Sequence, residues 1–499
     1  MSKENTVLLA YSGGLDTSCI LKWLQEKGYD VVTFTADIGQ EEDFDAARVK
    51  AEKLGAKQVV IQDLRREFCE EFISVGIQAN AIYEDRYLLG TALARPCIAR
   101  AMVKVAKNEG IRYISHGATG KGNDQIRFEL ACYALYPEVK IISPWRLPEF
   151  YTRFKGRSDL FEYAKENGIP LPITLKAPWS IDANLMHVSY ESGILEDPKN
   201  KAPDTLYEMT TDPEKAPDKP EKLEIEFRTG IPIRVKNLAD GTEKSDALGL
   251  YLYLNELGGR HGIGRIDIVE NRFLGMKSRG IYETPAGTIL REAHLDIENL
   301  TMDRELRKIK HQLSVEFSQQ VYRGLWYSPE CTFIRQCIEK SQEGIDGTVY
   351  CKLYKGHVYI TGRESPLSLY NQELVSMDVQ GEYNPEDAAG FITITALRSK
   401  SPSTYLLQER RDNTFPRENG IPTTTKTLQE QGINSNYIKL LSDIYTDNPT
   451  TVCLHKDSSI IKIKKAIRQE DTMPPKLSIA CTEKIFRTIE WTKKGININ

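Results

Sequence analysis

The chain has 499 residues, of which 40% are hydrophobic and 27% are charged, and its formal net charge at pH 7 is -4. These values are typical of a globular protein of two to four domains and exclude collagen, coiled-coil and disordered classes. No apolar run approaches the roughly 20 residues of a membrane span, and the acidic balance gives no general attraction to nucleic acid, so we expect neither a membrane nor a nucleic-acid partner.

Short apolar runs alternate with helical patterns over the first 165 residues, which indicates a parallel sheet wrapped by helices. The predicted strands are residues 6–11, 31–37, 58–63 and 112–116. The predicted helices are residues 17–27, 43–53, 66–79 and 97–108. We therefore expect a doubly wound α/β nucleotide-binding domain over residues 1–168.

The pattern changes to that of an α+β domain, which we place at residues 169–400. Five prolines and many charges over residues 197–220 predict an exposed loop. Alternating apolar and polar residues predict antiparallel hairpins over 223–235 and 348–360, turning at Thr229-Gly230 and Lys355-Gly356. Between them, the pattern from about residue 287 to 322 predicts one long helix.

Residues 401–499 form an extension of different composition. They hold 15 Lys and Arg against 11 Asp and Glu, a net charge of +4, whereas residues 1–400 hold 51 against 59, a net charge of -8. We expect a linker from Pro402 to Thr427 and then a possible small domain of unknown fold. Residues 435–445 suggest a helix, while 460–467 and 485–491 are strands or helices that periodicity does not distinguish.

The residues that follow the first predicted strand carry the chemistry. Ser12-Gly13-Gly14-Leu15-Asp16-Thr17-Ser18 leads directly into a helix, so backbone N–H groups, the helix dipole and three hydroxyls converge on one point. This is a phosphate cradle, in which side chains at positions 13 and 14 would block a close approach of the backbone. The alternative is an ordinary turn in which Ser or Thr caps the helix.

The loop is not one of the commoner nucleotide loops. The chain has no G-x-x-x-x-G-K-[ST] string, and no G-x-G-x-x-G follows the first strand. The segment instead resembles the SGGxDS motif of the PP-loop ATP pyrophosphatases, which cleave ATP between the α and β phosphates. The resemblance implies that the cradle holds the leaving pyrophosphate.

Further motifs narrow the resemblance. They are Tyr11 to Ser18, Ala-Asp-Ile-Gly-Gln at 36–40, Tyr87-Leu-Leu-Gly-Thr-Ala-Leu-Ala-Arg-Pro at 87–96, Ser115 to Glu129, and Ala183 to Glu191. With these five motifs in order, roughly residues 5–398 closely resemble the argininosuccinate synthases. That family joins citrulline and aspartate, using ATP, into argininosuccinate with release of AMP and pyrophosphate, in arginine biosynthesis or the urea cycle.

The resemblance implies three sets of binding residues. The ATP-binding set is Ala10, Tyr11, Ser12, Gly13, Gly14, Leu15, Asp16, Thr17, Ser18, Ala36, Ser115 and Gly117, with Asp16 as the residue expected to contact Mg²⁺. The aspartate-binding set is Thr119, Asn123 and Asp124. The citrulline-binding set is Tyr87, Asn123, Arg127, Ser180, Ser189, Glu270 and Tyr282.

The chemistry implied by the resemblance suits these residue types. The ureido oxygen of citrulline attacks the α-phosphate of ATP, and the aspartate amine then displaces AMP from the citrullyl-adenylate. Such a reaction depends mostly on positioning and charge neutralisation, and the sequence shows neither a nucleophile nor a base that would deprotonate the amine. One position departs from the family, since Ala92 replaces the usual serine near the citrulline carboxylate.

Several signals have a plainer alternative. Without the resemblance, Glu270 would be a solvated strand residue, and His116 and His187 would be satisfied core or turn histidines. The glycine-rich segment 258–265 could bind an anion or form a mobile surface loop. Cys331 and Cys337 lack zinc spacing, and the basic cluster at 462–468 is more typical of a solvated face.

Two rival functions remain open to test. One is a different PP-loop enzyme, either glutamine-dependent or tRNA-modifying; Ser2 stands where a glutaminase often has its cysteine, and residues 1–400 are acidic rather than basic. The other is a binding protein built on a decayed synthase. Intact loop residues such as Gly13 and Asp16 argue against decay. Release of pyrophosphate that requires both citrulline and aspartate would distinguish an active synthase from such a binding protein.

Cellular setting and assembly are also expectations. Nine cysteines without any CxxC, together with a polar amino end, predict a reduced, cytoplasmic protein. The resemblance implies a homotetramer, held in part by a helix near residues 392–401. Because Pro402 should end any such helix, we expect the extension to alter that contact.

Overall fold

The computed structural model describes residues 4–170, 179–378 and 381–412. The chain divides into two compact units, Met1–Gly381 and Glu382–Asn499, and each is described by itself. No helix in the described ranges combines the length and apolarity that crossing a membrane requires.

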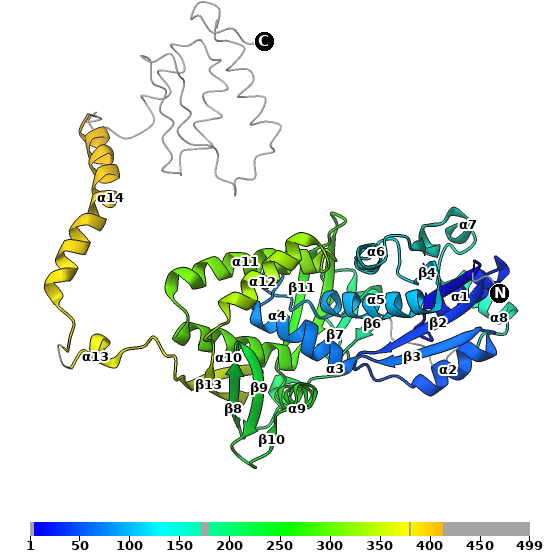
Figure 1. Cartoon of the computed structure of the whole chain (residues 1–499), viewed down its shortest axis with the longest axis horizontal. Helices are drawn as coiled ribbons and strands as arrows, with labels where there is room; N and C mark the ends of the chain where they lie inside the picture. The colour runs from blue at the N-terminus through cyan, green and yellow to red at the C-terminus, as the bar shows by residue number, and fades with distance from the viewer. Residues whose placement is uncertain (1–3, 171–178, 379–380, 413–499) are drawn as a thin grey trace, which may run out of the picture. The chain divides into compact units, whose positions relative to one another are not determined.

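The first domain is built on a five-stranded sheet of order β3-β2-β1-β4-β5, in which every pair is parallel (Figure 1). The strands are β1 (Thr6–Ala10), β2 (Asp30–Asp37), β3 (Gln58–Asp63), β4 (Tyr113–Ser115) and β5 (Lys140–Ile142). This confirms the predicted parallel sheet. β5 was not predicted, because three residues are too short to show a period.

Helices cover both faces of this sheet, which confirms the doubly wound α/β class. Val7 and Leu9 of β1 pack in one cluster with α1 (Leu15–Glu26), α2 (Phe44–Lys53) and α8 (Arg157–Glu166). Leu8, which points to the other face, packs with α5 (Gly90–Glu109) and α6 (Asp124–Leu135). Short helices η2 (Pro144–Arg146) and α7 (Pro148–Tyr151) precede α8.

Two helices depart from the predicted bounds. α5 begins at Gly90, seven residues before the predicted start, and it contains Pro96, which normally ends a helix because its ring removes an N–H donor. The predicted helix 66–79 is three consecutive helices: α3 (Arg65–Phe68), the π-helical η1 (Cys69–Ile73) and α4 (Ser74–Gln78). The hydroxyl of Ser74 donates to the carbonyl of Cys69 at the π-helical turn.

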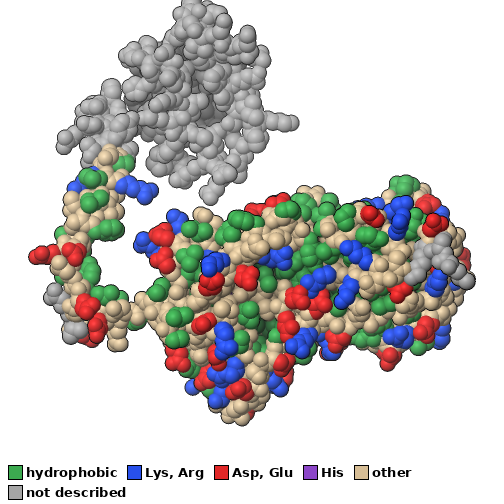
Figure 2. All heavy atoms as spheres, in the orientation of Figure 1, with side chains coloured by type: hydrophobic (Ala, Val, Ile, Leu, Met, Phe, Trp, Pro, Cys, Tyr) green, Lys and Arg blue, Asp and Glu red, His purple; other side chains and the backbone are tan. Residues whose placement is uncertain are grey.

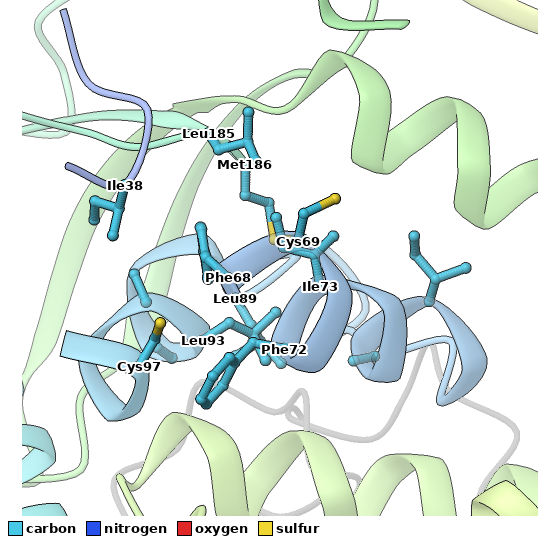
Figure 3. Close-up of a cluster of buried hydrophobic side chains, with 14 of the residues drawn as sticks. Ile38, Phe68, Cys69, Phe72, Ile73, Leu89, Leu93, Cys97, Leu185 and Met186 are labelled. Carbon is cyan, nitrogen blue, oxygen red and sulfur yellow. The ribbon is translucent and has the colours of Figure 1, made fainter. Parts of the chain in front are cut away.

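One part of the core joins the two halves of the larger unit. Figure 3 shows side chains of the π-helical segment packed against those around the start of α5, beside Ile38, Leu185 and Met186. Phe68 and Phe72 are fully buried there. This packing holds the first turn of α5 close to the segment after β6, and both contribute to the site below.

The second domain contains two antiparallel sheets. One has the order β10-β9-β8-β13-β14 and the other the order β11-β12-β7-β6. The strands are β6 (Ser180–Ala183), β7 (Val188–Glu191), β8 (Glu221–Arg228), β9 (Ile231–Asn237), β10 (Glu243–Lys244), β11 (Arg265–Asn271), β12 (Lys277–Glu283), β13 (Gly347–Tyr354) and β14 (His357–Glu364). Both predicted hairpins are confirmed, β8 with β9 and β13 with β14.

The helices of this domain correct one prediction. They are η3 (Gly193–Leu195), η4 (Pro213–Lys215), α9 (Ala247–Arg260), α10 (Pro285–Thr301), α11 (Arg304–Tyr322), α12 (Pro329–Ser341) and α13 (Gln372–Val375). The single helix predicted over 287–322 is wrong, because α10 ends before Met302. Asp303 then caps α11 by accepting hydrogen bonds from the N–H groups of Glu305 and Leu306.

The loop predicted to be exposed over 197–220 is partly buried. Leu206 and Ala216 are 1% and 5% exposed. The buried carboxylate of Glu283 also accepts a hydrogen bond from the N–H of Thr210 at 2.7 Å. The sequence showed the polarity of the loop but not this distant anchor. Only part of the glycine-rich segment 258–265 can be a surface loop, because Gly258 and Gly259 are buried in α9.

The second unit contains α14 (Pro385–Asp412), and this helix includes Pro402. The expectation that Pro402 ends a helix is therefore wrong. A proline removes its own N–H from the helical bonds and crowds the carbonyl four residues before it, which can kink a helix without ending it. The predicted linker therefore cannot begin at residue 402. The other features predicted for the extension lie outside the described residues; they are the elements over 435–445, 460–467 and 485–491 and the basic cluster at 462–468.

Candidate functional site

The loop between β1 and α1 has the geometry expected of a phosphate cradle. Gly14 caps α1, and Gly13 adopts a φ of +70°, which favours glycine. The hydroxyls of Ser12 and Thr17 are 3.2 Å apart, and Lys50 Nζ donates to the carbonyl of Gly13 at 2.7 Å. The N–H groups of the first turn of α1 have no partner within the helix, so the cradle presents several donors to an anion.

Other predicted ATP-site residues lie at the same edge of the sheet. Ala36 is near the end of β2 and Ser115 ends β4, and both strands pair with β1. A Cβ atom on Gly117 would lie 3.0 Å from Cγ2 of Thr17, so this glycine lets the two loops approach. The hydroxyl of Ser115 is buried without a hydrogen-bond partner. The structure therefore brings the cradle, Ala36, Ser115 and Gly117 to one edge, where open parallel sheets bind ligands.

The start of α6 carries a network of charged side chains. Arg95 Nη2 lies 2.8 Å from Asp124 Oδ2 and 2.8 Å from Asp182 Oδ2, and Arg127 Nη1 lies 3.0 Å from Asp124 Oδ1. Burial alone would raise the pKa of Asp124, but the two guanidinium groups hold it below its ordinary value. Asp124 is therefore a carboxylate at neutral pH, as recognition of an ammonium group requires.

Asn123 joins this network to the second domain. Its Nδ2 donates to the hydroxyl of Tyr322 at 3.0 Å, and that hydroxyl donates to Glu270 Oε1 at 3.0 Å. Arg127 Nε donates to the carbonyl of Tyr322 at 3.0 Å. Glu270 Oε2 is buried without a partner, and burial raises the pKa of Glu270. A ligand cation beside Glu270 would satisfy this oxygen and favour the charged form of the carboxyl group.

One face of the sheet β11-β12-β7-β6 gathers the remaining candidates. Tyr282 pairs with Ser189, and Ser189 pairs with Asp182. Glu270 pairs with Ser278, four residues before Tyr282. Alternate residues of a strand share a face, so the face holds Ser180, Asp182, Ser189, Glu191, Glu270 and Tyr282. The sequence-predicted residues of this sheet thus lie on a common surface.

Aromatic rings enclose one side of that surface. Tyr87 and Tyr282 have ring centroids 4.4 Å apart, and His187 stacks on Tyr282 at 5.7 Å. Thr91 donates its hydroxyl to Asp182 at 3.1 Å and so accepts from His187 Nε2, 2.9 Å away. Burial lowers the pKa of His187 to about 4, which agrees with a neutral ring protonated on Nε2.

The predicted residues differ in how far the structure brings them together. Thr119 lies on an exposed turn, and Ser180 is exposed at the start of β6. Ser189 donates its hydroxyl to the carbonyl of Asp182 at 3.2 Å, and Ala92 is buried in the first turn of α5. Tyr87, Asn123, Asp124, Arg127, Glu270 and Tyr282 form one connected group through the contacts above.

Sequence reasoning missed four groups of this site: Arg95, Asp182, His187 and Tyr322. Arg95 and His187 belong to quoted motifs, and Asp182 directly precedes one, so the motifs held a signal that was not used. Tyr322 ends a helix 199 residues after Asn123, and no local pattern pointed to it.

Comparisons with known proteins agree with this geometry. The family model described as the arginosuccinate synthase N-terminal HUP domain matches residues 6–170, and that of the arginosuccinate synthase C-terminal domain matches residues 179–402. The argininosuccinate synthases of Danio rerio and Homo sapiens are 67% and 66% identical over 398 and 400 residues. These alignments cover 80% of this chain in both cases, and 96% and 97% of the relatives.

A Xenopus tropicalis argininosuccinate synthase is 65% identical over 410 residues, covering 82% of this chain and 99% of that protein. One solved structure, a predicted subunit of a tRNA methyltransferase from Methanocaldococcus jannaschii, aligns with 32% of this chain and 74% of that protein's chain. Its TM-score of 0.24 and sequence identity of 18% are too low to support a conclusion about fold or function. With two family models spanning most of residues 6–402 and relatives two-thirds identical over nearly their whole length, the chain belongs to the argininosuccinate synthase family.

Proposed function

We propose that the ATP-dependent ligase activity of this family, which condenses citrulline with aspartate, occurs where the β1–α1 loop faces the charged network of α6 and the sheet β11-β12-β7-β6. The observation that carries the proposal is the continuity of residues 115–127. This segment begins at Ser115, beside the phosphate cradle, and reaches Asn123, Asp124 and Arg127, which contact the other half of the site.

In this proposal each substrate meets groups of matching charge. ATP lies over the cradle with the leaving pyrophosphate against the first turn of α1. Asp124 accepts from the ammonium group of aspartate, while Thr119 and Asn123 donate to its carboxylates. Arg127 pairs with the carboxylate of citrulline and Glu270 with its ammonium group, beside Ser180, Ser189 and the rings of Tyr87 and Tyr282.

The reaction then needs little covalent work from the protein. The ureido oxygen of citrulline forms a bond to the α-phosphorus and pyrophosphate leaves; the aspartate nitrogen then bonds the ureido carbon, AMP leaves, and the nitrogen loses a proton. The residues named above orient both substrates and neutralise their charges. His187 is poorly suited to act as the base, because its Nε2 donates to Thr91 and burial lowers its pKa to about 4.

Magnesium fits this site as a companion of ATP. Within the described ranges no group of three or more acidic, histidine or cysteine side chains could hold a metal ion alone. Mg²⁺ commonly binds through one or two carboxylates plus substrate phosphates, and Asp16 in the first turn of α1 supplies one carboxylate beside the cradle. Asp16 would hold the ion, and the ion would neutralise phosphate charge.

The exposed apolar side chains of α14 and the free cysteines bear on the assembly and the cellular location of the protein. α14 exposes Phe391, Ile392 and Ile394 by 73%, 62% and 71%, and Figure 2 shows hydrophobic side chains on the surface of this unit. Four copies of the chain would cover such a face, in line with a homotetramer. The seven cysteines of the described ranges are free, which suits a reducing cytoplasm.

We also propose that the chain has three domains, at residues 1–168, 169–400 and 401–499.

The test is pyrophosphate release by the purified full chain in the presence of Mg²⁺. We expect release from ATP only when citrulline and aspartate are both present, with argininosuccinate formed in equal amount. Arg127→Gln should raise the citrulline KM strongly, whereas Arg100→Gln, a control whose arginine pairs with Glu67 and Glu71, should not. Release with ATP alone, or no release under any condition, would exclude the proposal.

A further inference from the structure

A cavity lies beside the loop of residues 80–85, which precedes Tyr87 of the proposed citrulline site. It has a volume of about 430 Å³ and is lined by residues of three segments: the loop 80–85, α10 and α11. Its inner end holds Glu298 and Lys310, which are 1% and 2% exposed. None of the residues assigned above to ATP, aspartate or citrulline lines it.

Two arginines at this cavity have few hydrogen-bond partners. Arg307 Nε is buried without any hydrogen-bond partner. Arg291 Nε reaches the carbonyl of Asn80 only at 3.4 Å, and its Nη1 lies 3.7 Å from Glu292 Oε1. Burial lowers the pKa of Arg291 although Glu292, Asp85 and Glu298 act in the opposite direction, so the cost of burying this charge is not fully offset.

Most carboxylates at the cavity are already engaged. Glu298 accepts from Asn80 Nδ2 at 2.6 Å and from Gln342 Nε2 at 2.9 Å, and it lies 2.7 Å from Lys310 Nζ. Glu84 accepts from the backbone N–H and the side-chain amide of Asn271. Asp85 also lines the cavity, but its side chain is exposed to solvent. Three carboxylates thus face three cations in the lining, and among these Arg307 Nε lacks a hydrogen-bond partner while Arg291 Nε has only the long contact to Asn80.

The walls also include apolar surface from Ile82, Leu295 and Val315. A fully hydrated inorganic ion gains nothing from such walls, whereas an anion with a carbon skeleton buries apolar area against them. We propose that this cavity binds a small organic anion with two or more negative charges, held by Arg291 and Arg307.

The loop beside the cavity connects it to the citrulline side of the active site. The N–H of Ile82 donates to the hydroxyl of Ser318 on α11 at 3.0 Å, and the next residue, Tyr83, stacks on Tyr322 with ring centroids 3.6 Å apart. Asn80, Glu84 and Asp85 have positive φ angles, so the loop is held in a sparsely populated conformation. Occupancy should therefore alter the citrulline KM, a consequence that rests on the proposed function.

Calorimetric titration of the full chain with citrate, and separately with inorganic phosphate, tests the site. We expect saturable citrate binding that persists with citrulline and aspartate present, and a weaker response to phosphate. Arg291→Gln and Arg307→Gln should each weaken citrate binding at least tenfold, while Lys308→Gln, which removes the same charge from the exposed side of α11, should not. Melting curves of all variants check that they fold.

Other results would overturn the proposal. Absence of saturable binding would do so, as would equal weakening by Lys308→Gln, which would indicate general charge attraction. Loss of binding in Arg127→Gln but not in Arg307→Gln would place citrate in the substrate site, and tighter binding of phosphate would contradict an organic ligand. If citrate binds here but leaves the citrulline KM unchanged, the coupling through Tyr83 is wrong while the binding site stands.

Discussion

The hydroxyl of Tyr322 donates a hydrogen bond of 3.0 Å to Oε1 of Glu270. Tyr322 ends α11, whereas Glu270 lies in β11, so this bond joins a helix and a sheet of the second domain at the site. Burial raises the pKa of Tyr322, so its hydroxyl keeps its proton at neutral pH and acts as the donor. The hydroxyl oxygen of Tyr322 also accepts a hydrogen bond from Asn123 Nδ2. Tyr322 therefore positions both Asn123 and Glu270, two residues of the proposed citrulline site.

Tyr322→Phe should raise the citrulline KM while the ring still stacks on Tyr83. A hydrogen bond to a charged group contributes about 1.5–3 kcal/mol, which corresponds to a rise of roughly 10- to 150-fold. Steady-state kinetics with citrulline as the varied substrate measure this. Tyr327→Phe is the matched control, because that hydroxyl donates to the carbonyl of Pro96 away from the site. Equal changes in both variants would contradict a positioning role for Tyr322.

A residue of the site could be predicted from the pattern of the sequence where it lies inside a short local motif. Gly13, Asp16 and Asn123 belong to short motifs whose pattern carries their meaning, and the parallel sheet follows from alternating patterns. Tyr322 meets Asn123 through tertiary packing alone. Glu283 anchors Thr210 in the same way across 73 residues, so the loop predicted at 197–220 is confirmed as a loop while its predicted exposure is wrong in part. At Pro96 and Pro402, the surrounding helix tolerated a residue that local propensity would exclude.

The two cradle glycines should differ in their tolerance of a side chain. Gly13 has a φ of +70°, where an L-residue costs about 1–2 kcal/mol, and its added Cβ would meet Ala47 at 3.4 Å. Gly14 has a φ of -70°, and its added Cβ would contact only the Ser12 hydroxyl, also at 3.4 Å. Gly13→Ala should therefore raise the ATP KM more than Gly14→Ala, as pyrophosphate release at varied ATP will measure. A larger effect at position 14 would mean that the bound phosphate, not the loop conformation, sets the requirement for glycine.

Ala92→Ser should lower the citrulline KM. Ala92 is buried one residue after Thr91, whose hydroxyl contacts Asp182, and a serine there restores the hydroxyl usual in the family. A neutral hydrogen bond contributes about 0.5–1.5 kcal/mol, so a decrease of roughly 2- to 10-fold is expected. Ala99→Ser, also buried in α5, controls for the effect of a hydroxyl on the helix. An unchanged or higher KM in Ala92→Ser would count against the site assignment.

The buried carboxylate of Glu298 should make stability depend on pH. Burial alone would raise its pKa, but His294 and Lys310 hold the pKa below the ordinary value of 4.5. A carboxyl group with a lowered folded-state pKa stabilises the protein above 4.5 and loses that contribution as pH falls toward the folded value. The melting temperature of the native chain should exceed that of Glu298→Gln at pH 7, and the gap should narrow below about pH 4.5.

The control for this measurement is Glu305→Gln, whose carboxylate forms an exposed pair with Arg304. Exposed pairs contribute little to stability, so this variant should melt with the native chain at every pH. A gap between native chain and Glu298→Gln that stays constant from pH 7 to pH 3.5 would show that Glu298 acts through shape and not through charge.

Removal of α14 should dissolve the proposed tetramer. The helix starts at Pro385, after the boundary between the two units at Gly381, so a chain ending at Gly381 keeps the larger unit whole. It loses the exposed apolar side chains of Phe391, Ile392 and Ile394 that need a covering partner. Light scattering should give a tetramer mass for the full chain and for one ending at Leu407, and a smaller assembly for the chain ending at Gly381. A tetramer that persists without α14, or that is lost on ending at Leu407, would assign the contact to other residues.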